Sequence, residues 1–561
     1  MPNETIKDIL SASFYFSTIF PTMNKKQLFI FMLLSVLMTN CTQQRNRVIE
    51  LPEAGLRSHQ VVEISKVVLT DTATILHIDA NFHPNWWIRI DSTTYIQANG
   101  RQYVVERAEG INLNEHHFMP DSGEDHFVLF FPPIPRNTRT IDFIGPEDSF
   151  RIWDINLTGR DRRFRPDLPA DVLNFRADAT VSLPEPVFEI GNTSVTLHIT
   201  GLRDGFALND FRMFINNVFT QMQEEIEPQE VERGVFLFEF DLFATTPVFI
   251  GFYGNFGLRG VSMILSPGES AEMFVDATAH SKSISRLRPR PDLVYAGFRG
   301  KFAQVNTKLL QTGGETEGRF THIGIRNHPE IIDMSAQEYI DFLRTIYNDK
   351  VTQLENSDLP IAVRQVFMAS LKADFVNNIW LMQHNIEDAY RALHNLAWNA
   401  PIDFVAPTPT ESELISALQD LDIGNPMNMY GRFYGFGIVL PATWRLSLEA
   451  LNEITGSETG FLQDMHQHSI TFHQLLNTAE VSEERRNALQ TAFLPKCIII
   501  LLKNSRDEWK KQWHEAVLKL QKRRMCTAIE FLKPFLQNIM ESLCLSTFGQ
   551  LGALPAFKQK E

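Results

Sequence analysis

The sequence is that of an acidic, globular chain with room for several domains. It has 561 residues, of which 44% are hydrophobic and 21% are charged, and this composition excludes a disordered tail or a fibre. The formal net charge of -15 at pH 7 repels phosphate backbones, and no basic stripe interleaved with aromatic residues occurs before residue 500. We therefore expect no nucleic-acid partner.

The first stretch has the pattern of a bacterial export signal rather than of a folded element. A short positive region with Lys25 and Lys26 precedes an apolar run from Leu28 to Met38. The run is too short to span a bilayer comfortably but suits a signal peptide. Met23 is then the expected true start, and residues 1–22 are an upstream extension.

The apolar run ends at Cys41 in a segment that resembles a loose lipobox. Asn40 departs from the pattern, because Gly, Ala or Ser is usual before the cysteine. The resemblance implies lipid attachment at Cys41 and a signal peptide covering 1–41. The alternative is an uncleaved anchor helix in which Cys41 is incidental. In both cases we expect a protein of the cell envelope, held at the membrane by its anchor and facing the periplasm or the cell surface.

Cysteine usage limits the chemistry of the body. The chain has four cysteines, and none lies in residues 42–496; they are Cys41, Cys497, Cys526 and Cys544. A body without thiols has no disulfide framework, no thiolate-bound zinc and no cysteine nucleophile. We expect no cofactor, no metal and no catalytic residue in it.

Two blocks of β pattern follow the signal. In the first, expected over 45–160, Leu76, Ile78 and Ala80 alternate with polar residues, and short apolar runs end at turn signals. In the second, expected over 170–280, Val195 and two further apolar residues alternate strictly with polar ones. We predict two β-sandwich-like modules in series.

The period of the pattern changes from two to 3.6 after a basic, Pro-containing hinge at 286–291. Ser335 with Glu338 and Thr410 with Glu413 form two capping boxes, and Pro360 opens a long helix. We therefore predict a helical domain over 296–496. The expected fold class is α+β and multidomain: two β-sandwich-like modules followed by a helical domain.

A glycine-rich segment and a cluster of histidines have residue types that occur in phosphate-binding and metal-binding sites. The segment 313–318 is glycine-rich but lacks the lysine of a phosphate loop, so we expect a flexible turn. The spacing of His466, His468 and His473 does not stack imidazoles on one helical face, and solvated helix residues are expected.

Two features of the first β block are more open. His116 and His117 with Glu124–His126 would suit a divalent ion, although polar loop composition explains them equally well. Trp86 and Trp87 straddle the two faces of a strand, so one indole is expected in the core and the other on a possible contact surface.

The last residues, 498–561, differ from the rest. Three of the four cysteines lie in 497–561, and basic residues dominate from Lys503 to Arg524. Consecutive codons can also be read in another frame, by joining the third base of one codon to the first two bases of the next. In that frame, the codons of Met540 and Glu541 must encode Gly. Later junctions are compatible with V-D-F-W-A-T-W-C-x-P-C. We expect this segment to be an out-of-frame tail.

The shadow sequence GK-x-V-x-V-D-F-W-A-T-W-C-x-P-C is similar to the strand and active-site loop of thioredoxin-like disulfide reductases. The chain therefore resembles the N-terminal extension of a TlpA-like envelope disulfide reductase whose thioredoxin domain is lost by a frameshift after about residue 497. The resemblance implies thiol-disulfide chemistry at a Cys-x-x-Cys pair. No residue of this chain inherits those roles, and the thioredoxin fold is not expected in this frame.

Two interpretations remain open. The first is a relative of thioredoxin-like oxidoreductases that lacks redox activity as translated. The second is a non-enzymatic envelope binding lipoprotein whose β modules recognise a protein or a glycan. The expected partners are the membrane, through the lipid anchor, and possibly an envelope protein.

Overall fold

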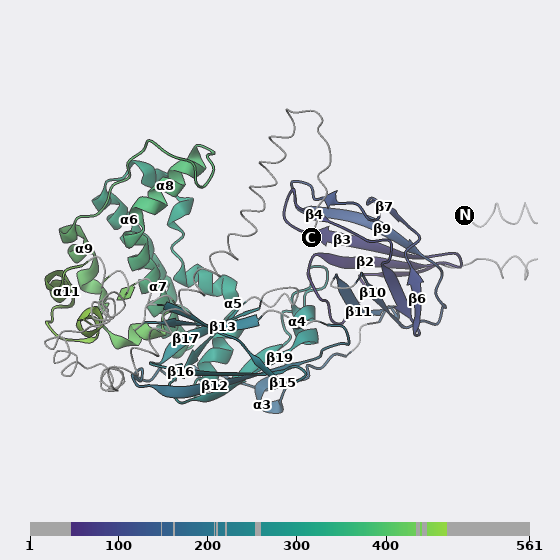
Figure 1. Cartoon of the computed structure of the whole chain (residues 1–561), viewed down its shortest axis with the longest axis horizontal. Coiled ribbons are helices and arrows are strands. Elements are labelled where there is room, and N and C mark those ends of the chain that lie inside the picture. The colour runs from purple at the N-terminus through teal and green to yellow at the C-terminus, as the bar shows by residue number, and fades with distance from the viewer. Residues whose placement is uncertain are drawn as a thin grey trace, which may run out of the picture.

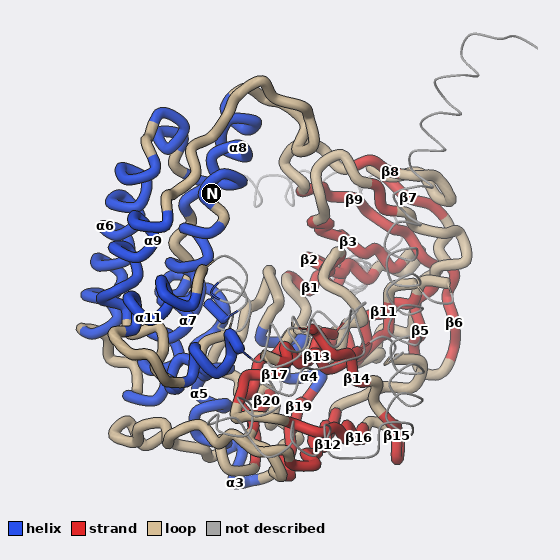
Figure 2. Tube along the Cα trace, turned by 60° about the vertical axis from the view of Figure 1, so that its left-hand side comes forward, coloured by secondary structure: helices blue, strands red, loops and turns tan. Residues whose placement is uncertain are grey.

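The computed structural model describes residues 46–467, apart from 147–148, 161–162, 207, 209–210, 219–221, 253–259, 433–437, 440–441 and 443–445. The described part of the chain is a mixture of mainly antiparallel sheets and helices, so the predicted α+β class is confirmed. The pair of sheets formed by residues 191–299 lies between the pair formed by residues 47–156 and most of the helices (Figures 1 and 2).

The first sheet pair is built from residues 47–156. Its five-stranded sheet has the order β1-β2-β3-β9-β7, and its four-stranded sheet has the order β11-β10-β5-β6. Both sheets contribute to one hydrophobic core. The strands are β1 (Arg47–Glu50), β2 (Val62–Leu69), β3 (Thr74–Asn81), β4 (Trp87–Ile88), β5 (Tyr95–Ala98), β6 (Arg101–Val104), β7 (Arg107–Glu109), β8 (His117–Phe118), β9 (Glu124–Phe131), β10 (Thr140–Ile144) and β11 (Arg151–Asn156).

The strand β3, in the middle of its sheet, alternates strictly between buried and half-buried residues. Leu76, Ile78 and Ala80 are buried, and the residues between them are half-buried. The strand β9 continues the same pattern with Phe127, Leu129 and Phe131 pointing into the core. A period of two places one face of each strand on the core and the other toward solvent.

The second sheet pair is built from residues 191–299. The five-stranded sheet has the order β15-β16-β12-β19-β20, and β12 and β19 pair in parallel. The four-stranded sheet has the order β14-β13-β17-β18. The strands are β12 (Gly191–Thr200), β13 (Phe211–Asn217), β14 (Met222–Ile226), β15 (Gln229–Glu232), β16 (Val235–Leu242), β17 (Thr246–Phe252), β18 (Val261–Leu265), β19 (Ser270–Asp276) and β20 (Ala296–Arg299).

The hinge predicted at 286–291 does not separate β structure from helix. The helix α4 (Ala277–Ser283) lies before it, and β20 lies after it and pairs with β19 from Glu272 to Val275. Four residues are too few for alternation to be recognised against the surrounding pattern. The sheet therefore extends into the part of the chain that was predicted to be helical.

A buried ion pair of the first sheet pair is hydrogen-bonded to the segment that follows α4 in the second sheet pair. Arg57 Nη1 lies 2.8 Å from Glu63 Oε2, and the two side chains are only 7% and 4% exposed. Glu63 also accepts hydrogen bonds from the Ser285 hydroxyl at 2.7 Å and from the Arg286 amide at 2.8 Å. Beside them, Lys282 Nζ on α4 lies 2.7 Å from Glu53 Oε1. A buried charge requires such partners, because an unpaired charge in the interior is costly.

Most helices lie on the side of the second sheet pair away from the first, whereas α4 lies at the joint between the two sheet pairs (Figure 1). The helices are α3 (Ala170–Leu173), α4, α5 (Ala303–Thr321), α6 (Ala336–Glu355), α7 (Ile361–Trp380), α8 (Met382–Leu393), α9 (Glu411–Leu418) and α11 (Leu448–Thr455), with short 3-10 turns η1 (Ile325–Asn327), η2 (Pro329–Asp333), η3 (Gln419–Leu421) and η4 (Pro426–Tyr430). A shared apolar cluster connects Ile264 of β18 with Phe302, before α5, and Val363 of α7.

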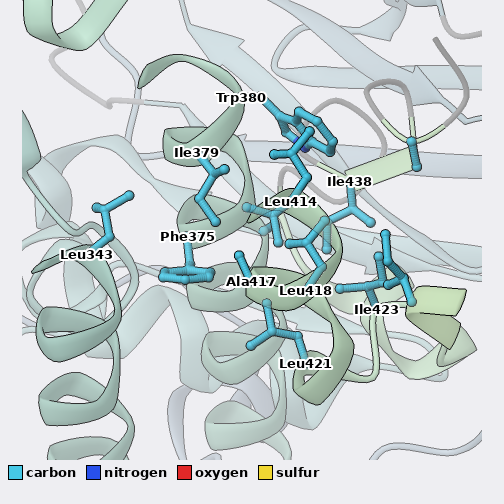
Figure 3. Close-up of a cluster of buried hydrophobic side chains, with 14 of the residues drawn as sticks. Leu343, Phe375, Ile379, Trp380, Leu414, Ala417, Leu418, Leu421, Ile423 and Ile438 are labelled. Carbon is cyan, nitrogen blue, oxygen red and sulfur yellow. The ribbon is translucent and has the colours of Figure 1, made fainter. Parts of the chain in front are cut away.

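Both predicted capping boxes are present. Ser335 and Glu338 satisfy each other's backbone amides at the start of α6, and Thr410 and Glu413 do the same for α9. The long helix predicted from Pro360 to about Gln383 is α7, which ends at Trp380, and α8 follows from Met382. The core between these helices contains Leu343, Phe375, Ile379 and other large apolar side chains (Figure 3).

Candidate binding surface

Two short strands of the first sheet pair form a separate ribbon. Trp87 of β4 lies opposite Phe118 of β8, and Ile88 lies opposite His117. Cross-strand partners point to the same side of a ribbon. Ile88 is buried in the core, whereas the side chains of Trp87 and Phe118 are 48% and 63% exposed. The outer side of this ribbon is therefore aromatic.

A tight turn holds Trp86 beside the ribbon. The Trp86 amide donates to the His83 carbonyl at 3.1 Å, and the intervening Asn85 has a φ of 61°. The Met119 amide donates to the Trp86 carbonyl at 2.7 Å, which ties the turn to β8. The indole is 62% exposed, and its ring meets Phe82 edge-on with centroids 6.1 Å apart. The backbone of this residue is thus fixed while its ring faces solvent.

Gly123 closes the neighbouring turn at a point where no side chain fits. Its φ is +70°, and a Cβ atom there would lie 2.5 Å from the Phe82 carbonyl oxygen. The Phe82 amide donates to the Gly123 carbonyl at 2.9 Å. A left-handed backbone of this kind favours glycine. The segment around Phe82, on which the Trp86 ring rests, is therefore held in place.

Histidines and polar groups border the aromatic rings. The rings of Trp87 and His116 stack with centroids 3.9 Å apart. Asn85 Nδ2 donates to Asp121 Oδ1 at 3.2 Å. We call the exposed set His83, Trp86, Trp87, His116 and Phe118 the aromatic ribbon surface.

The prediction that one of the two adjacent tryptophans enters the core is wrong. Both indoles are exposed, and Ile88 and Ile90 occupy the inward positions. The strand has only two residues, so alternation begins after Trp86. Phe118 was not recognised from the sequence. The signal for it was its spacing of two from His116, which places both side chains on the same side of a strand.

The predicted His and carboxylate group separates into two hydrogen-bonded pairs. His117 Nε2 lies 2.6 Å from Asp125 Oδ2, and His126 Nδ1 lies 2.6 Å from Asp79 Oδ1. Burial by itself would raise the pKa of Asp125, but hydrogen bonds from His117 and from the His126 amide lower it. No group of three or more potential ligands in the described part of the chain has metal-binding geometry. The first pair therefore connects β8 to β9, and the second connects β9 to β3.

Two other predicted features lie elsewhere. His466 is buried, not solvated, and its Nε2 lies 3.3 Å from the Leu446 carbonyl oxygen. Its helix turns inward with Leu462 and Met465 in the core. The glycine-rich segment 313–318 is not a loop, because α5 runs through it with one break at Gly313. His468, His473 and the four cysteines, including Cys41, lie outside the described residues.

A cavity of about 590 Å³ lies between the second sheet pair and the helices. It is lined by apolar residues such as Phe249, Leu309 and Tyr430 and by polar residues such as Ser262 and Ser370. Arg432 Nη1 and Glu317 Oε1 form an ion pair 3.1 Å long at its wall. Because the two charges neutralise each other, this ion pair presents no net charge to a ligand in the cavity. We assign no chemistry to the cavity.

The architecture and the exposed aromatic surface define an α+β protein with a candidate binding surface. Comparison with protein-family models, characterised proteins and solved structures returned no match. Among the helices that the structure describes, none combines the length and the apolar composition needed to cross a membrane.

Proposed function

We propose that this chain is a non-enzymatic binding lipoprotein of the bacterial envelope and that the aromatic ribbon surface is its contact site. The observation that carries the proposal is the joint exposure of Trp86, Trp87 and Phe118 on a fixed ribbon. Exposing large apolar rings costs hydrophobic free energy, so a cluster of them on a soluble surface usually has a binding role. The finer architecture belongs to this proposal: two β-sandwich-like modules and a helical domain present the surface.

A fractionation experiment tests the binding role. The intact protein is titrated with solubilised envelope protein, polysaccharide and lipid vesicles, and binding is recorded by isothermal titration calorimetry. We expect one fraction to bind, and we expect Trp86→Ala combined with Trp87→Ala to abolish the binding. Trp398→Ala is the matched control, because this indole is 76% exposed in the loop after α8. Equal responses of both variants would refute the proposal.

The membrane anchor is proposed from the segment that ends at Cys41. The lipidated protein should partition into detergent and incorporate labelled palmitate, and Cys41→Ala should release or mislocalise it. A wild-type protein that takes up no label would contradict the anchor. The proposed location is the envelope, with the body facing the periplasm or the cell surface and no nucleic acid among its partners.

A second proposal concerns the origin of the gene. We propose that it is related to genes of TlpA-like envelope disulfide reductases, with a change of reading frame after about residue 497. The codon junctions from Met540 onward support this relationship, because they are compatible with the thioredoxin active-site loop. Reading the nucleotides under residues 490–561 tests it directly. As translated, the chain contains no Cys-x-x-Cys pair, and the purified protein should not catalyse thiol-dependent reduction of insulin.

A further inference from the structure

We infer that the aromatic ribbon surface binds an uncharged oligosaccharide, with sugar rings stacked on Trp86 and Trp87. This inference rests on the proposed binding function and names the chemical class of the ligand. It is carried by the size of the surface, by the polar groups around it and by the charges nearby.

The size of the surface favours a small ligand. A whole aromatic side chain contributes about 150–250 Å² of surface, and Trp86, Trp87 and Phe118 are each about half exposed. Together they offer a few hundred Å², whereas a stable protein interface covers about 800 Å² on each partner. Polar residues lie beside Trp86 in the sequence and structure, including Asn85 and its partner Asp121. The apolar area therefore matches two or three sugar rings better than a protein.

The ring faces suit the apolar side of a sugar. The C–H groups on one face of a pyranose carry small positive charges, and they pack flat on the negative face of an aromatic ring. The stacking of Trp87 on His116 occupies one face of its indole. Trp86 contacts Phe82 edge-on, in a T-shaped arrangement. Two neighbouring indoles make two platforms, so binding should strengthen with the length of the oligosaccharide.

The polar border supplies partners for hydroxyl groups. Asn85 and Asp121 lie 3.2 Å apart next to Trp86, and Asn112 Nδ2 donates to Glu115 Oε2 at 2.8 Å in the segment before β8. Amide and carboxylate groups have free lone pairs or N–H groups after one such bond. A sugar hydroxyl both donates and accepts, so neighbouring hydroxyls fit these planar groups.

The nearby charges select against an acidic ligand. Glu115, Asp121 and Glu124 are exposed carboxylates near the ribbon, and the nearby Arg89 is paired with Asp91 at 3.0 Å. An acidic glycan or an anionic headgroup would be repelled by these carboxylates, and the net charge of -15 adds to the repulsion. At neutral pH an uncharged sugar chain meets the least opposition.

The test uses the intact protein and isothermal titration calorimetry with named probes. The probes are cellohexaose, chitohexaose and maltohexaose, their disaccharides, a sulfated hexasaccharide and phosphatidylglycerol vesicles. We expect at least one uncharged hexasaccharide to bind, its disaccharide to bind at least fivefold more weakly, and the sulfated probe not to bind better. Trp87→Ala should weaken binding at least tenfold, Trp87→Phe should retain most of it, and Trp398→Ala should leave it unchanged. Thermal melts show that each variant is folded.

The outcomes separate the ligand class from the binding function. Binding of vesicles or of solubilised envelope protein that needs Trp87, with no response to any uncharged hexasaccharide, would overturn the inference and leave the proposed function standing. Absence of any binding that depends on Trp86 or Trp87 would overturn both. Binding of a hexasaccharide that is equal in the wild type and in Trp87→Ala would also overturn the inference, because it would place the sugar elsewhere.

Discussion

At the scale of single residues, Glu63 is the most sensitive position in the joint between the two sheet pairs. Its carboxylate holds Arg57 at 2.8 Å and accepts bonds from Ser285 and from the Arg286 amide. Glu63→Gln removes the charge but keeps the shape, which leaves a buried guanidinium without its counter-ion. We expect a loss of about 3–5 kcal/mol in the free energy of unfolding, measured by urea denaturation.

An exposed ion pair provides the control for this prediction. Arg107 and Glu109 are neighbours on β7, and their side chains are 56% and 59% exposed. Solvent screens such pairs, so Glu109→Gln should change the free energy of unfolding by less than about 0.5 kcal/mol. A similar small effect for Glu63→Gln would show that the joint is not buried in solution.

His59 makes stability depend on pH. Burial, together with the positive charge of Arg57, lowers the pKa of its imidazole from 6.5 to about 4. The unfolded chain therefore takes up a proton first as the pH falls, and protonation favours unfolding. The free energy of unfolding should decrease as the pH falls from 6.5 to 4, by up to about 3 kcal/mol.

The variant His59→Gln isolates this contribution. The imidazole accepts a hydrogen bond from the Val61 amide at 3.0 Å and meets the Phe150 ring edge-on. Gln retains an acceptor but does not titrate between pH 4 and 7. Denaturation curves across this range should be flatter for the variant than for the wild type. Equal slopes would show that the imidazole is solvated in the folded protein.

At the scale of the elements, two adjacent glycines of α5 make a matched pair. Gly313 has φ 77° and ψ 154° and breaks the helix, whereas a Cβ atom on Gly314 meets nothing within 4 Å. Gly314→Ala should stabilise the protein by about 0.4–1 kcal/mol, because it restricts the unfolded chain. Gly313→Ala should cost about 1–3 kcal/mol, because the backbone is strained for any residue with a side chain. Thermal melts of both variants provide the measurement, and equal shifts would contradict the break.

Local signals predicted some elements well. The capping boxes at Ser335 and Thr410 and the alternation in β3 and β12 were confirmed because each depends on neighbouring residues only. The class of the fold followed from these patterns. The anchor at Cys41 and the resemblance in the tail lie outside the described residues and remain predictions.

Features that depend on distant contacts were not predictable in the same way. The buried Arg57 pairs with Glu63 nearby in sequence, but it also donates to the hydroxyls of Ser281 and Ser285, more than two hundred positions later. Exposure of both Trp86 and Trp87 depends on where a two-residue strand begins. The burial of His466 depends on the carbonyl of Leu446. For the candidate surface, the sequence indicated the tryptophans and one histidine but not Phe118 or the turn that holds them.

At the scale of the whole molecule, shared cores should make the described body unfold as one unit. Leu56 and Trp153 belong to the first sheet pair by sequence but lie in the core of the second. Ile264 of β18 lies in the same cluster as Val363 and Phe367 of α7. Calorimetry of the intact protein should show one main transition for these parts, and Trp153→Ala should shift it by the equivalent of about 3–5 kcal/mol. A separate transition for the first sheet pair would contradict this coupling.

The joint around Glu63 also has a consequence for the order of events during synthesis. The first sheet pair is complete in sequence at Asn156, and Ser285 follows about 130 positions later. A ribosome that adds about 5–20 residues per second needs on the order of ten seconds to make that interval, and during this time the hydroxyl and the amide that complete the Glu63 site have not yet been made. Until then, the charged surface around Glu63 on the first sheet pair stays exposed to water. A chaperone that binds incompletely folded chains would have its substrate during this interval.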